Sequence, residues 1–558
     1  MSAVLSESDD GDVRVEPRIV ALSGPVGSGK TTLARSLASK FNAVHIRTQD
    51  LMADTAVGLE IVLEPERRAM QKFGEQLDRD TDGQWVAHQI AKLVAGGRVR
   101  GELLIVDAVR TLQQVDALRE VFPANVTHIH MYAPEAVLTQ RYQDRHDSGF
   151  VELSSYQDVA EDPTEANVVT LTNDADITID THRCSALDVL ARATAALNLY
   201  PSLADRLVDV FIGGQYGSEG KGNVAYHLAN EYDLLMRVGG PNAGHRVPTT
   251  PPYTHRLLPS GTLANRRAKL VIGPGATLDL TVLMGEIAAC SVDPERLSID
   301  PQAMIIEPED LEKEAELVKT IASTGKGGGA ASARRIMGRH GGASPKVRLA
   351  REVTELTPYV RSTADILETA FRDGKKVMLE GTQGTLLSLF HGFYPWVTSR
   401  DTTTAACLSE AGIGPHRLRK VVMVVRTYPI RVGDPPASAA TSGAMGAEID
   451  WDEIAERSGL NKDELRANER GSVSGSERRV AEFDWNLLRR ASELNGATDI
   501  ALTFADYLSA DNLHARRFDQ LTDDTIRFVE EVSRVGGAPV SLIATGFDNR
   551  ALIDRREW

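Results

Sequence analysis

Two short apolar runs in this chain lead directly into glycine-rich loops. The first run, residues 18–24, continues into GPVGSGKTT at residues 24–32, which fits the phosphate-loop pattern G-x-x-x-x-G-K-[ST]. The second run, residues 208–214, continues into GGQYGSEGKGN at residues 213–223, which does not fit because Gly222 stands where the pattern has a hydroxyl. A buried strand that enters a glycine loop and then a helix is typical of parallel α/β sheets. The two loops therefore predict two α/β domains.

The length of the chain agrees with this division. At 558 residues it exceeds what one core supports, since a domain has roughly 150 residues. We expect a disordered tail at residues 1–17, a P-loop domain with a parallel sheet flanked by helices at residues 18–204, and a larger α/β domain at residues 205–558. The tail is acidic and serine-rich, without the basic start and apolar run of a signal peptide.

The composition of the chain argues against some classes of binding partner. The chain has 62 Lys and Arg residues against 78 Asp and Glu residues, a formal net charge of −16. Nucleic acid polymers and anionic membranes bind to cationic surfaces, so neither is expected as a partner. Cys184, Cys290 and Cys407 are far apart, which argues against a disulfide framework and favours the cytoplasm. No apolar run reaches the roughly 18 residues of a membrane span.

The first glycine loop predicts a site for a nucleoside triphosphate with Mg²⁺. In the P-loop pattern, Lys30 reaches the outer phosphates and Thr31 binds the metal. The helix that follows adds the positive end of its dipole. Gly24, Gly29 and Thr32 complete the expected triphosphate-binding loop.

Polar residues follow the later strands of the first third. Asp107 ends the apolar run ELLIVDAVR, where P-loop enzymes place a ligand of magnesium-bound water; a capping role is the alternative. Asp50 could hold the phosphoryl acceptor, and Arg141 and Arg145, four residues apart on one helix face, clamp a phosphoryl group or lie in solvent. Residues 18–200 resemble small P-loop nucleotide kinases of the adenylate and dephospho-coenzyme A kinase type. The resemblance leaves the acceptor open, and an ATP-binding sensor domain is the alternative.

The rest of the chain carries an ordered series of motifs, many of them glycine-rich loops after apolar runs, which let backbone amides approach anions. In order they are MRVGGPNAGHRV (236–247), HRLLPSGTL (255–263), VIGPGATLDL (271–280), STGKGGGAA (323–331), LEGTQGTLLSLFHGFYPWVTSRDTTTA (379–405), RTYPIRVGD (426–434), GSVSGSERR (471–479), LTFADYL (502–508) and ATGFDNRALIDRR (544–556). This set resembles the adenylosuccinate synthetases over residues 207–558, with the length of their compact archaeal and phage branch. Members phosphorylate the 6-oxygen of a purine nucleotide with a nucleoside triphosphate and then let the amine of aspartate displace that phosphate. Their loop reads G-D-E-G-K-G, which accounts for the second, imperfect phosphate loop.

The resemblance implies catalytic roles. A purine lactam oxygen becomes nucleophilic only when the N1 proton is removed, a task for a general base, and Ser218 stands at that position and at a magnesium position. His245 is the acid that assists at the 6-oxygen, and the Gly244 carbonyl helps to hold Mg²⁺. Lys221 holds the transferring phosphoryl group, and Gln383 belongs to the same catalytic set.

The resemblance also implies binding residues. The purine nucleotide is expected at Asn242, Thr324, Gln383, Leu387, Thr398 and Arg431. The triphosphate is expected at Gly217, Glu219, Gly220, Lys221, Gly222 and the base-reading Asp506. L-Aspartate is expected at Val473, Ser474 and Arg478. Relatives are dimers, so a homodimer is expected, in which the arginine that reaches the partner is one of Arg334, Arg335 and Arg339.

Four positions depart from the family pattern. Ser218 replaces an aspartate, as in the phage branch that makes 2-aminoadenylosuccinate from dGMP, and the change frees space and removes charge near the purine 2-position. We therefore expect a guanine nucleotide as substrate. Phe504 stands where many relatives have lysine, which leaves ATP or GTP open as the donor. Ser476 and Glu477 replace arginines of the aspartate loop, which loosens aspartate binding or admits another amine.

The leading interpretation is a ligase that condenses L-aspartate with C6 of (d)GMP through a 6-phosphoryl intermediate, joined to an N-terminal nucleotide kinase. The alternative within the same class is ordinary adenylosuccinate synthesis from IMP with GTP. The alternative of another class is a non-catalytic nucleotide sensor or scaffold, suggested by Ser218 and the altered aspartate loop. His245, Lys221 and Gln383 argue against it.

Overall fold

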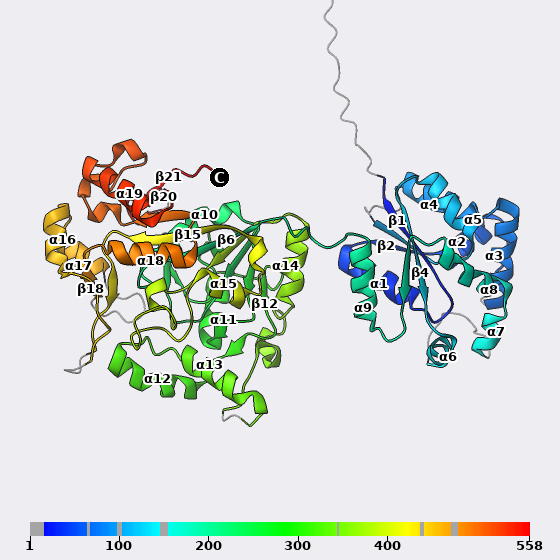
Figure 1. The fold of residues 1–558 in the computed structure, drawn as a ribbon, viewed down its shortest axis with the longest axis horizontal. Coiled ribbons are helices and arrows are strands. Elements are labelled where there is room, and N and C mark those ends of the chain that lie inside the picture. The colour runs from blue at the N-terminus through cyan, green and yellow to red at the C-terminus, as the bar shows by residue number, and fades with distance from the viewer. Residues whose placement is uncertain are drawn as a thin grey trace, which may run out of the picture. The chain divides into compact units, whose positions relative to one another are not determined.

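The computed structural model describes residues 16–63, 67–97, 103–144, 155–342, 345–435, 440–469, 478–548 and 550–558. The chain divides into two compact units, an N-terminal unit, Met1–Tyr200, and a C-terminal unit, Pro201–Trp558 (Figure 1). The domain boundary expected between residues 204 and 205 stays a prediction. Several sequence predictions fall outside the described residues, namely those for tail residues 1–15, Arg145, Val473, Ser474, Ser476 and Glu477.

The N-terminal unit is built on a parallel sheet whose described strands run in the order β2-β3-β1-β4-β5. These strands are β1 (Arg18–Ser23), β2 (Val44–Arg47), β3 (Leu103–Asp107), β4 (Val126–Tyr132) and β5 (Ile177–Asp180). The glycine loop leaves the carboxyl end of the central strand β1 and enters α1 (Lys30–Phe41), whose buried face carries Leu33 and Leu37. The predicted strand, loop and helix are confirmed, and the loop lies at the sheet edge where parallel α/β folds bind ligands.

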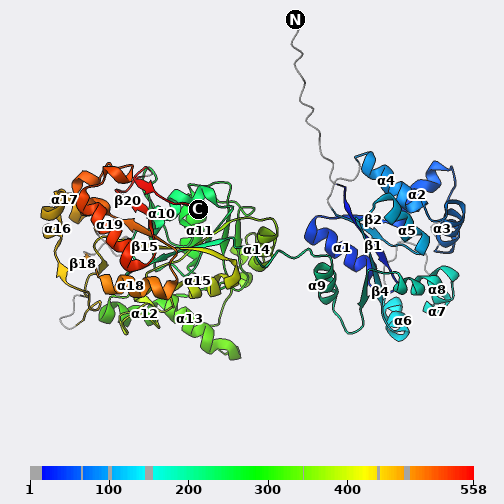
Figure 2. The ribbon, with the colours of Figure 1, turned by 45° about the horizontal axis from the view of Figure 1, so that its top comes forward.

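Helices cover both faces of this sheet (Figures 1 and 2). They are α1, α2 (Thr48–Gly58), α3 (Arg67–Thr81), α4 (Trp85–Ala95), α5 (Leu112–Val121), α6 (Glu135–Gln143), α7 (Tyr156–Ala160), α8 (Pro163–Thr170) and α9 (Ala186–Ala196). One apolar cluster joins the sheet to α2, α3, α4 and α5, and a second joins it to α1 and α9. Because both faces are covered, every residue of β3 is buried.

The C-terminal unit is built on a larger sheet with the described strand order β12-β10-β7-β14-β6-β15-β19-β20-β21. The strands are β6 (Val208–Gly213), β7 (Leu234–Arg237), β10 (Lys269–Ile272), β12 (Leu297–Ile299), β14 (Val377–Glu380), β15 (Leu418–Arg426), β19 (Asp499–Thr503), β20 (Val540–Ala544) and β21 (Leu552–Asp554). Pairing is parallel except between β20 and β21. The predicted α/β fold is therefore confirmed for both units.

Helices and small sheets surround this large sheet. The helices are α10 (Lys221–Leu228), α11 (Leu280–Ala289), α12 (Pro308–Ile321), α13 (Gly328–Met337), α14 (Thr363–Arg372), α15 (Thr404–Ala411), α16 (Trp451–Ser458), α17 (Lys462–Asn468), α18 (Trp485–Asn495) and α19 (Asp523–Gly536). The small sheets pair β8 (His245–Val247) with β9 (Tyr253–His255), β11 (Thr277–Leu278) with β13 (Met304–Ile305), and β18 (Arg478–Ala481) with β16 (Ile430–Val432) and β17 (Glu448–Ile449). Two large apolar clusters of buried residues line the main sheet and make the core.

In the part of the chain that the structure describes, none of the helices combines the length and the apolar character needed to cross a bilayer.

Candidate functional site

The phosphate loop of the N-terminal unit brings a cation, a hydroxyl and a carboxylate together. The Lys30 ammonium donates to two carbonyl oxygens of its own loop, at 2.6 and 2.8 Å. Asp107 at the end of β3 hydrogen-bonds to Thr31, and its Oδ2 lies 3.0 Å from His45 Nε2. Burial opposes ionisation of Asp107, but the hydrogen bonds from His45 and Thr31 and the charge of Lys30 hold its pKa below the usual value. A hydroxyl beside an ionised carboxylate is a donor set that fits Mg²⁺.

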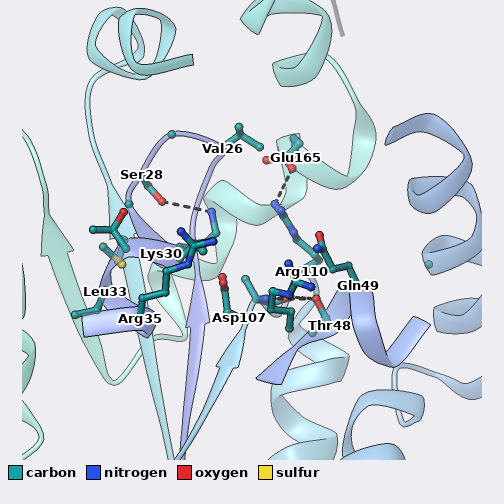
Figure 3. A pocket seen from close by; sticks show the side chains of 18 of the residues that line it. Val26, Ser28, Lys30, Leu33, Arg35, Thr48, Gln49, Asp107, Arg110 and Glu165 are labelled. Carbon is teal, nitrogen blue, oxygen red and sulfur yellow. Dashed lines mark hydrogen bonds and ion pairs between the residues drawn. The ribbon is translucent and has the colours of Figure 1, made fainter. Parts of the chain in front are cut away.

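A cavity of about 750 Å³ extends from this loop. Lys30, Arg35, Thr48, Asp107 and Arg110 line it, and Figure 3 shows their side chains around the same space. A volume of this size is within the range of small-molecule sites. The N-terminal unit therefore has room for a ligand beyond the phosphates that the glycine loop would hold.

Two other predicted kinase residues differ in their placement. Arg141 in α6 lines the cavity and donates to Thr181 Oγ1 at 2.9 Å and to the Gly27 carbonyl at 3.3 Å. Asp50 is half-exposed, pairs with Arg47 at 2.7 Å and is not among the residues that line the cavity. Arg141 is thus positioned beside the phosphate loop, whereas the carboxylate of Asp50 is engaged at the surface.

In the C-terminal unit, the loop after β6 is organised by a buried ion pair. The Lys221 ammonium lies 2.7 Å from Glu219, and both side chains are about 1% exposed. The second oxygen of Glu219 accepts from the backbone N–H groups of Gln215 and Gly217, at 2.9 and 2.8 Å. Glu219 therefore fixes the loop's shape and the position of Lys221. Ser218, in the same loop, is only partly buried, and its carbonyl accepts from Arg426 at 3.3 Å.

Steric contact with a neighbouring strand explains why residue 222 is a glycine. Gly222 lies in the first turn of α10, which packs against β8, and a Cβ there would come within 2.8 Å of the Cβ of His245. The hydroxyl-bearing residue of an ordinary P-loop would clash with the strand that presents His245. The departure from the P-loop pattern is therefore tied to the placement of a candidate catalytic side chain.

His245 is buried and anchored through one ring nitrogen. Its Nδ1 hydrogen-bonds to Glu380, which also accepts from the Ser260 backbone N–H at 2.7 Å and lies 3.7 Å from the Arg237 guanidinium. Burial lowers the pKa of His245, with the charge of Arg237 acting in the same direction and Glu380 opposing it. Glu380 keeps a lowered pKa, despite its burial, because His245, Arg237 and Ser260 stabilise the carboxylate. His245 Nε2 has no partner among the described residues and is left for a ligand.

Three predicted nucleotide-binding residues form one connected group. Gln383 Nε2 donates to Thr398 Oγ1 at 2.6 Å, and the Thr398 backbone N–H donates to the Leu387 carbonyl at 2.8 Å. Gln383 has a φ of 63°, a left-handed conformation that costs a non-glycine residue roughly 1–2 kcal/mol. Its Cα would lie 3.1 Å from a Cβ at Gly217, so this group lies against the glycine loop.

Two more of these residues lie near a helix start. The Oδ1 atom of Asn242 would be 3.1 Å from a Cβ at Gly328, the first residue of α13. Thr324, four residues earlier, is exposed. The structure gives no direct contact between Asn242 and Thr324 in the described part of the chain.

Arg431 is a buried cation with unused hydrogen-bonding capacity. It is 5% exposed, its guanidinium lies 4.7 Å from the centre of the Tyr216 ring, and one of its nitrogens donates to the Trp396 carbonyl at 3.1 Å. Its Nε and Nη1 atoms are buried without a hydrogen-bond partner among the described residues. Burial lowers the pKa of Arg431. Such a group is expected to bind an anion.

Arg478 and Arg479, by contrast, are occupied by carboxylates. Arg478 lies 3.3 Å from Glu469, and Arg479 pairs with Glu448 and lies 3.0 Å from Asp434. Arg479 is therefore neutralised in this conformation, whereas Arg478 shares the single carboxylate of Glu469 with Arg426.

The predicted base-reading acid, Asp506, lies in a buried cluster. Its Oδ1 has no partner among the described residues, and burial raises its pKa to about 6, so it is mostly ionised at neutral pH. Next to it, Arg426 stacks over Phe504, 3.9 Å from the ring centre, and lies 2.9 Å from Glu469. Phe504, at the position where many relatives have lysine, therefore packs against the guanidinium of Arg426.

Sequence reasoning missed the residues that hold His245. Glu380 and Arg237 are charged residues at the carboxyl ends of buried strands, β14 and β7. The same signal identified Asp107 at the end of β3 and was available for both. No group of three His, Cys, Asp or Glu side chains suited to a metal occurs among the residues searched, which are the described ones. The roles of Ser218 and the Gly244 carbonyl as ligands of Mg²⁺ stay predictions.

Comparisons with known proteins agree with this geometry. Residues 210–346 and 345–513 match the family model described as adenylosuccinate synthetase, and residues 20–152 match one described as an AAA domain. The adenylosuccinate synthetase of Methanococcus aeolicus is 36% identical over 356 residues, which cover 62% of this chain and 99% of that protein. That of Thermococcus onnurineus is 37% identical, over 62% of this chain and 98% of the relative.

Two solved structures are similar to the C-terminal unit. The adenylosuccinate synthetase of Plasmodium falciparum, 21% identical, matches with a TM-score of 0.54 over 63% of this chain and 100% of that one, which shows the fold. The succinoaminodeoxyadenylate synthetase of cyanophage S-2L, solved with dGMP and with dATP as energy donor, is 26% identical, with a TM-score of 0.53 over 63% of this chain and 96% of that one.

The fold, the glycine loop and the histidine site define a purine nucleotide ligase that carries a P-loop kinase-like unit at its N-terminus. The chain belongs to the adenylosuccinate synthetase family. The family uses GTP and Mg²⁺ and binds a nucleotide and aspartate as substrates.

Proposed function

We propose that the C-terminal unit condenses L-aspartate with C6 of a guanine nucleotide, dGMP or GMP, to give a 2-aminoadenylosuccinate. The feature that carries this proposal is Ser218 in the loop after β6, a short and neutral side chain that would leave room for a 2-amino group if the purine binds beside it as the family resemblance implies. The similarity to the cyanophage synthetase solved with dGMP supports the same substrate class.

The proposed reaction has two steps. First the N1 proton passes to a solvent water molecule, the 6-oxygen bonds to the γ-phosphorus of the triphosphate, and the bond from that phosphorus to the β,γ-bridging oxygen breaks. The aspartate nitrogen then attacks C6, orthophosphate departs with the original 6-oxygen, and the nitrogen loses a proton to solvent. Lys221 and the amides of the glycine loop stabilise the transferring group, and His245 Nε2 acts at the 6-oxygen. Bound Mg²⁺ would neutralise charge on the triphosphate.

The substrate assay tests this proposal directly. The pure full-length chain is given L-aspartate, Mg²⁺ and either ATP or GTP with dGMP, GMP or IMP in turn, and orthophosphate and the succinyl product are quantified. We expect aspartate-dependent turnover of a guanine nucleotide, with a kcat/KM larger than that for IMP. Turnover of IMP alone contradicts it and favours the second candidate, ordinary adenylosuccinate synthesis, which the archaeal relatives named for that activity support.

Ser218→Asp is expected to shift the enzyme from guanine nucleotides towards IMP. A carboxylate at residue 218 adds bulk and charge beside the purine 2-position and restores the family's base. The ratio of kcat/KM for dGMP to that for IMP should fall about 10-fold or more, since one misplaced group near a substrate is worth about 1–3 kcal/mol. Ser218→Ala serves as the matched control, because it keeps the space and the neutrality. An unchanged ratio in Ser218→Asp would contradict the assigned role.

Arg431→Met is expected to weaken substrate binding and to stabilise the free protein. We propose that the unpaired N–H groups of Arg431 receive an anionic group of a substrate. Loss of charged hydrogen bonds should raise a substrate KM about 10- to 100-fold. Removal of a buried, unpaired charge should raise the Tm in the absence of ligands.

Arg479→Met is the control for this prediction, because Arg479 pairs with Arg431 in register across β16 and β18 but has carboxylate partners. Steady-state kinetics and thermal unfolding measure both variants. A lower Tm together with unchanged KM values for the nucleotide and aspartate would assign Arg431 a structural role instead.

We further propose that the N-terminal unit is a nucleotide kinase, using the loop that contains Lys30 and Thr31 and the cavity beside it. The match to a P-loop family model and the grouping of Thr31 with Asp107 support this activity. The test is transfer of phosphate from ATP to a nucleoside monophosphate by the full-length chain, detected as a nucleoside diphosphate.

A further inference from the structure

The cavity of the N-terminal unit continues past the phosphate loop into a compartment with apolar walls. Met52 of α2, Met70 of α3 and Trp85 at the start of α4 all line it. Gly74, on the turn of α3 after Met70, also lines it, and a Cβ there would come within 3.2 Å of the Met52 sulfur. The absence of a side chain at Gly74 keeps this part of the compartment open. Walls of this kind favour a flat apolar group rather than a polyhydroxylated one.

One polar group in this compartment lacks a partner. Both side-chain atoms of Gln71, Oε1 and Nε2, are buried and have no hydrogen bond within the described part of the chain. Gln71 lines the cavity. A buried carboxamide without partners costs roughly 1–3 kcal/mol per unsatisfied group, so a ligand that supplies both partners is favoured.

Two polar groups of the same cavity, Asp78 and Gln114, are already satisfied by the protein. Asp78 accepts from the Trp85 indole N–H at 2.7 Å and from the Gln114 amide at 2.8 Å. The amide oxygen of Gln114 accepts from the Arg110 backbone N–H at 2.8 Å. These bonds fix the frame of the compartment and leave the Gln71 amide as a donor and acceptor pair for a ligand.

The side of the cavity nearer the phosphate loop carries cationic side chains beside the carboxylates of Asp107 and Glu165 (Figure 3). Arg110 and Arg35 line it together with Lys30, and Arg110 is held by Glu165 at 2.6 Å (Figure 3). A phosphate group bound there would lie near the loop that holds a triphosphate. The cavity therefore has a place for a phosphate at one end and for a flat group with one hydrogen-bonding edge at the other.

We infer that this compartment binds a purine nucleoside monophosphate as the phosphoryl acceptor and that Gln71 reads the edge of its base. A carboxamide makes a bidentate pair with a base edge that presents a donor beside an acceptor, as a 6-aminopurine does. In the reaction, a phosphate oxygen of the acceptor bonds to the γ-phosphorus of ATP and the bond to the β,γ-bridging oxygen breaks. The products are a nucleoside diphosphate and ADP. The inference rests on the proposed kinase activity.

The test is a kinase assay with the full-length chain and MgATP. The acceptors are dAMP, the 2,6-diaminopurine deoxynucleotide, dGMP, dCMP and gluconate, each without aspartate so that ligation is silent. Product diphosphate is the readout, because the C-terminal unit also binds purine monophosphates. We expect a purine monophosphate to be the preferred acceptor. Preference for gluconate or dCMP overturns the inference while leaving a kinase, and no transfer to any acceptor overturns both the inference and the kinase proposal.

Gln71→Leu then tests the residue itself. The variant should raise the KM for the preferred purine monophosphate about 10- to 100-fold, with a smaller change in kcat. Gln140→Leu on α6 is the control, since Gln140 is exposed and bonds to Asp144. Equal KM values for every nucleotide in Gln71→Leu and the parent chain would overturn the assignment of Gln71. A Tm at or above that of the parent chain shows that the variant is folded.

Discussion

His245→Ala is expected to lower kcat for aspartate ligation about 10²- to 10⁴-fold, the range that a positioned acid or base contributes. The Nε2 atom of His245 is buried without a hydrogen-bond partner among the described residues, and Glu380 fixes the ring through Nδ1. The assay is aspartate-dependent release of orthophosphate with the preferred nucleotide.

A second variant distinguishes a catalytic role of His245 from a structural one. His245→Asn keeps a polar atom able to reach Glu380 but lacks Nε2, so it should fold with a near-normal Tm and still be slow. His416→Asn, at an exposed position, is the control. If His245→Asn retains near-parental kcat, His245 only supports the fold.

The pH profile gives a third readout for the same residue. With Nδ1 held by the ionised Glu380, His245 can donate from Nε2 only as the imidazolium. Its pKa is lowered by burial, so the protonated fraction in the free enzyme decreases as pH rises through the acidic range. We expect kcat/KM to show a limb that falls with rising pH, and this limb should be absent in His245→Ala. An identical profile in the two proteins would contradict the acid role.

Lys30→Met is expected to reduce phosphoryl transfer by the N-terminal unit about 10²- to 10³-fold, the loss seen when one fixed group that stabilises transition-state charge is removed. Ligation by the C-terminal unit should stay within about twofold, because the two sites belong to separate units and share no residue. Both activities are measured in one preparation.

Lys92→Met, on the exposed face of α4, is the matched control. If Lys30→Met abolishes ligation as well, the second activity depends on the first and the proposed independence of the two sites is wrong. If kinase activity is unchanged, Lys30 does not contact the transferring phosphate.

The parts of the fold that follow local rules could be predicted from the sequence. The apolar runs before both glycine loops indicated buried parallel strands, and β1 and β6 begin where this pattern placed them. His245 was identified from a motif. Its partner Glu380 is 135 residues away, and only the neighbouring positions of β8 and β14 in the folded unit bring them together.

The sequence did not indicate which charged side chains contact one another in the fold. Arg478 was expected to bind aspartate, and the fold adds a contact with Glu469 at 3.3 Å that the sequence did not indicate. Arg431 was expected at the edge of the nucleotide pocket, and the fold adds that its guanidinium is buried with N–H groups that lack partners among the described residues. Gln71 lies in an amphipathic helix with no motif, so only the folded cavity identifies it.

The measurement that tests the central claim most directly follows the fate of one oxygen atom. dGMP labelled with ¹⁸O at the 6-position is incubated with the full-length chain, ATP or GTP, Mg²⁺ and L-aspartate, and the orthophosphate is analysed by mass spectrometry. Activation of the purine by phosphorylation predicts that each orthophosphate formed with the product carries the purine's ¹⁸O. Product accompanied by unlabelled orthophosphate would contradict the 6-phosphoryl intermediate.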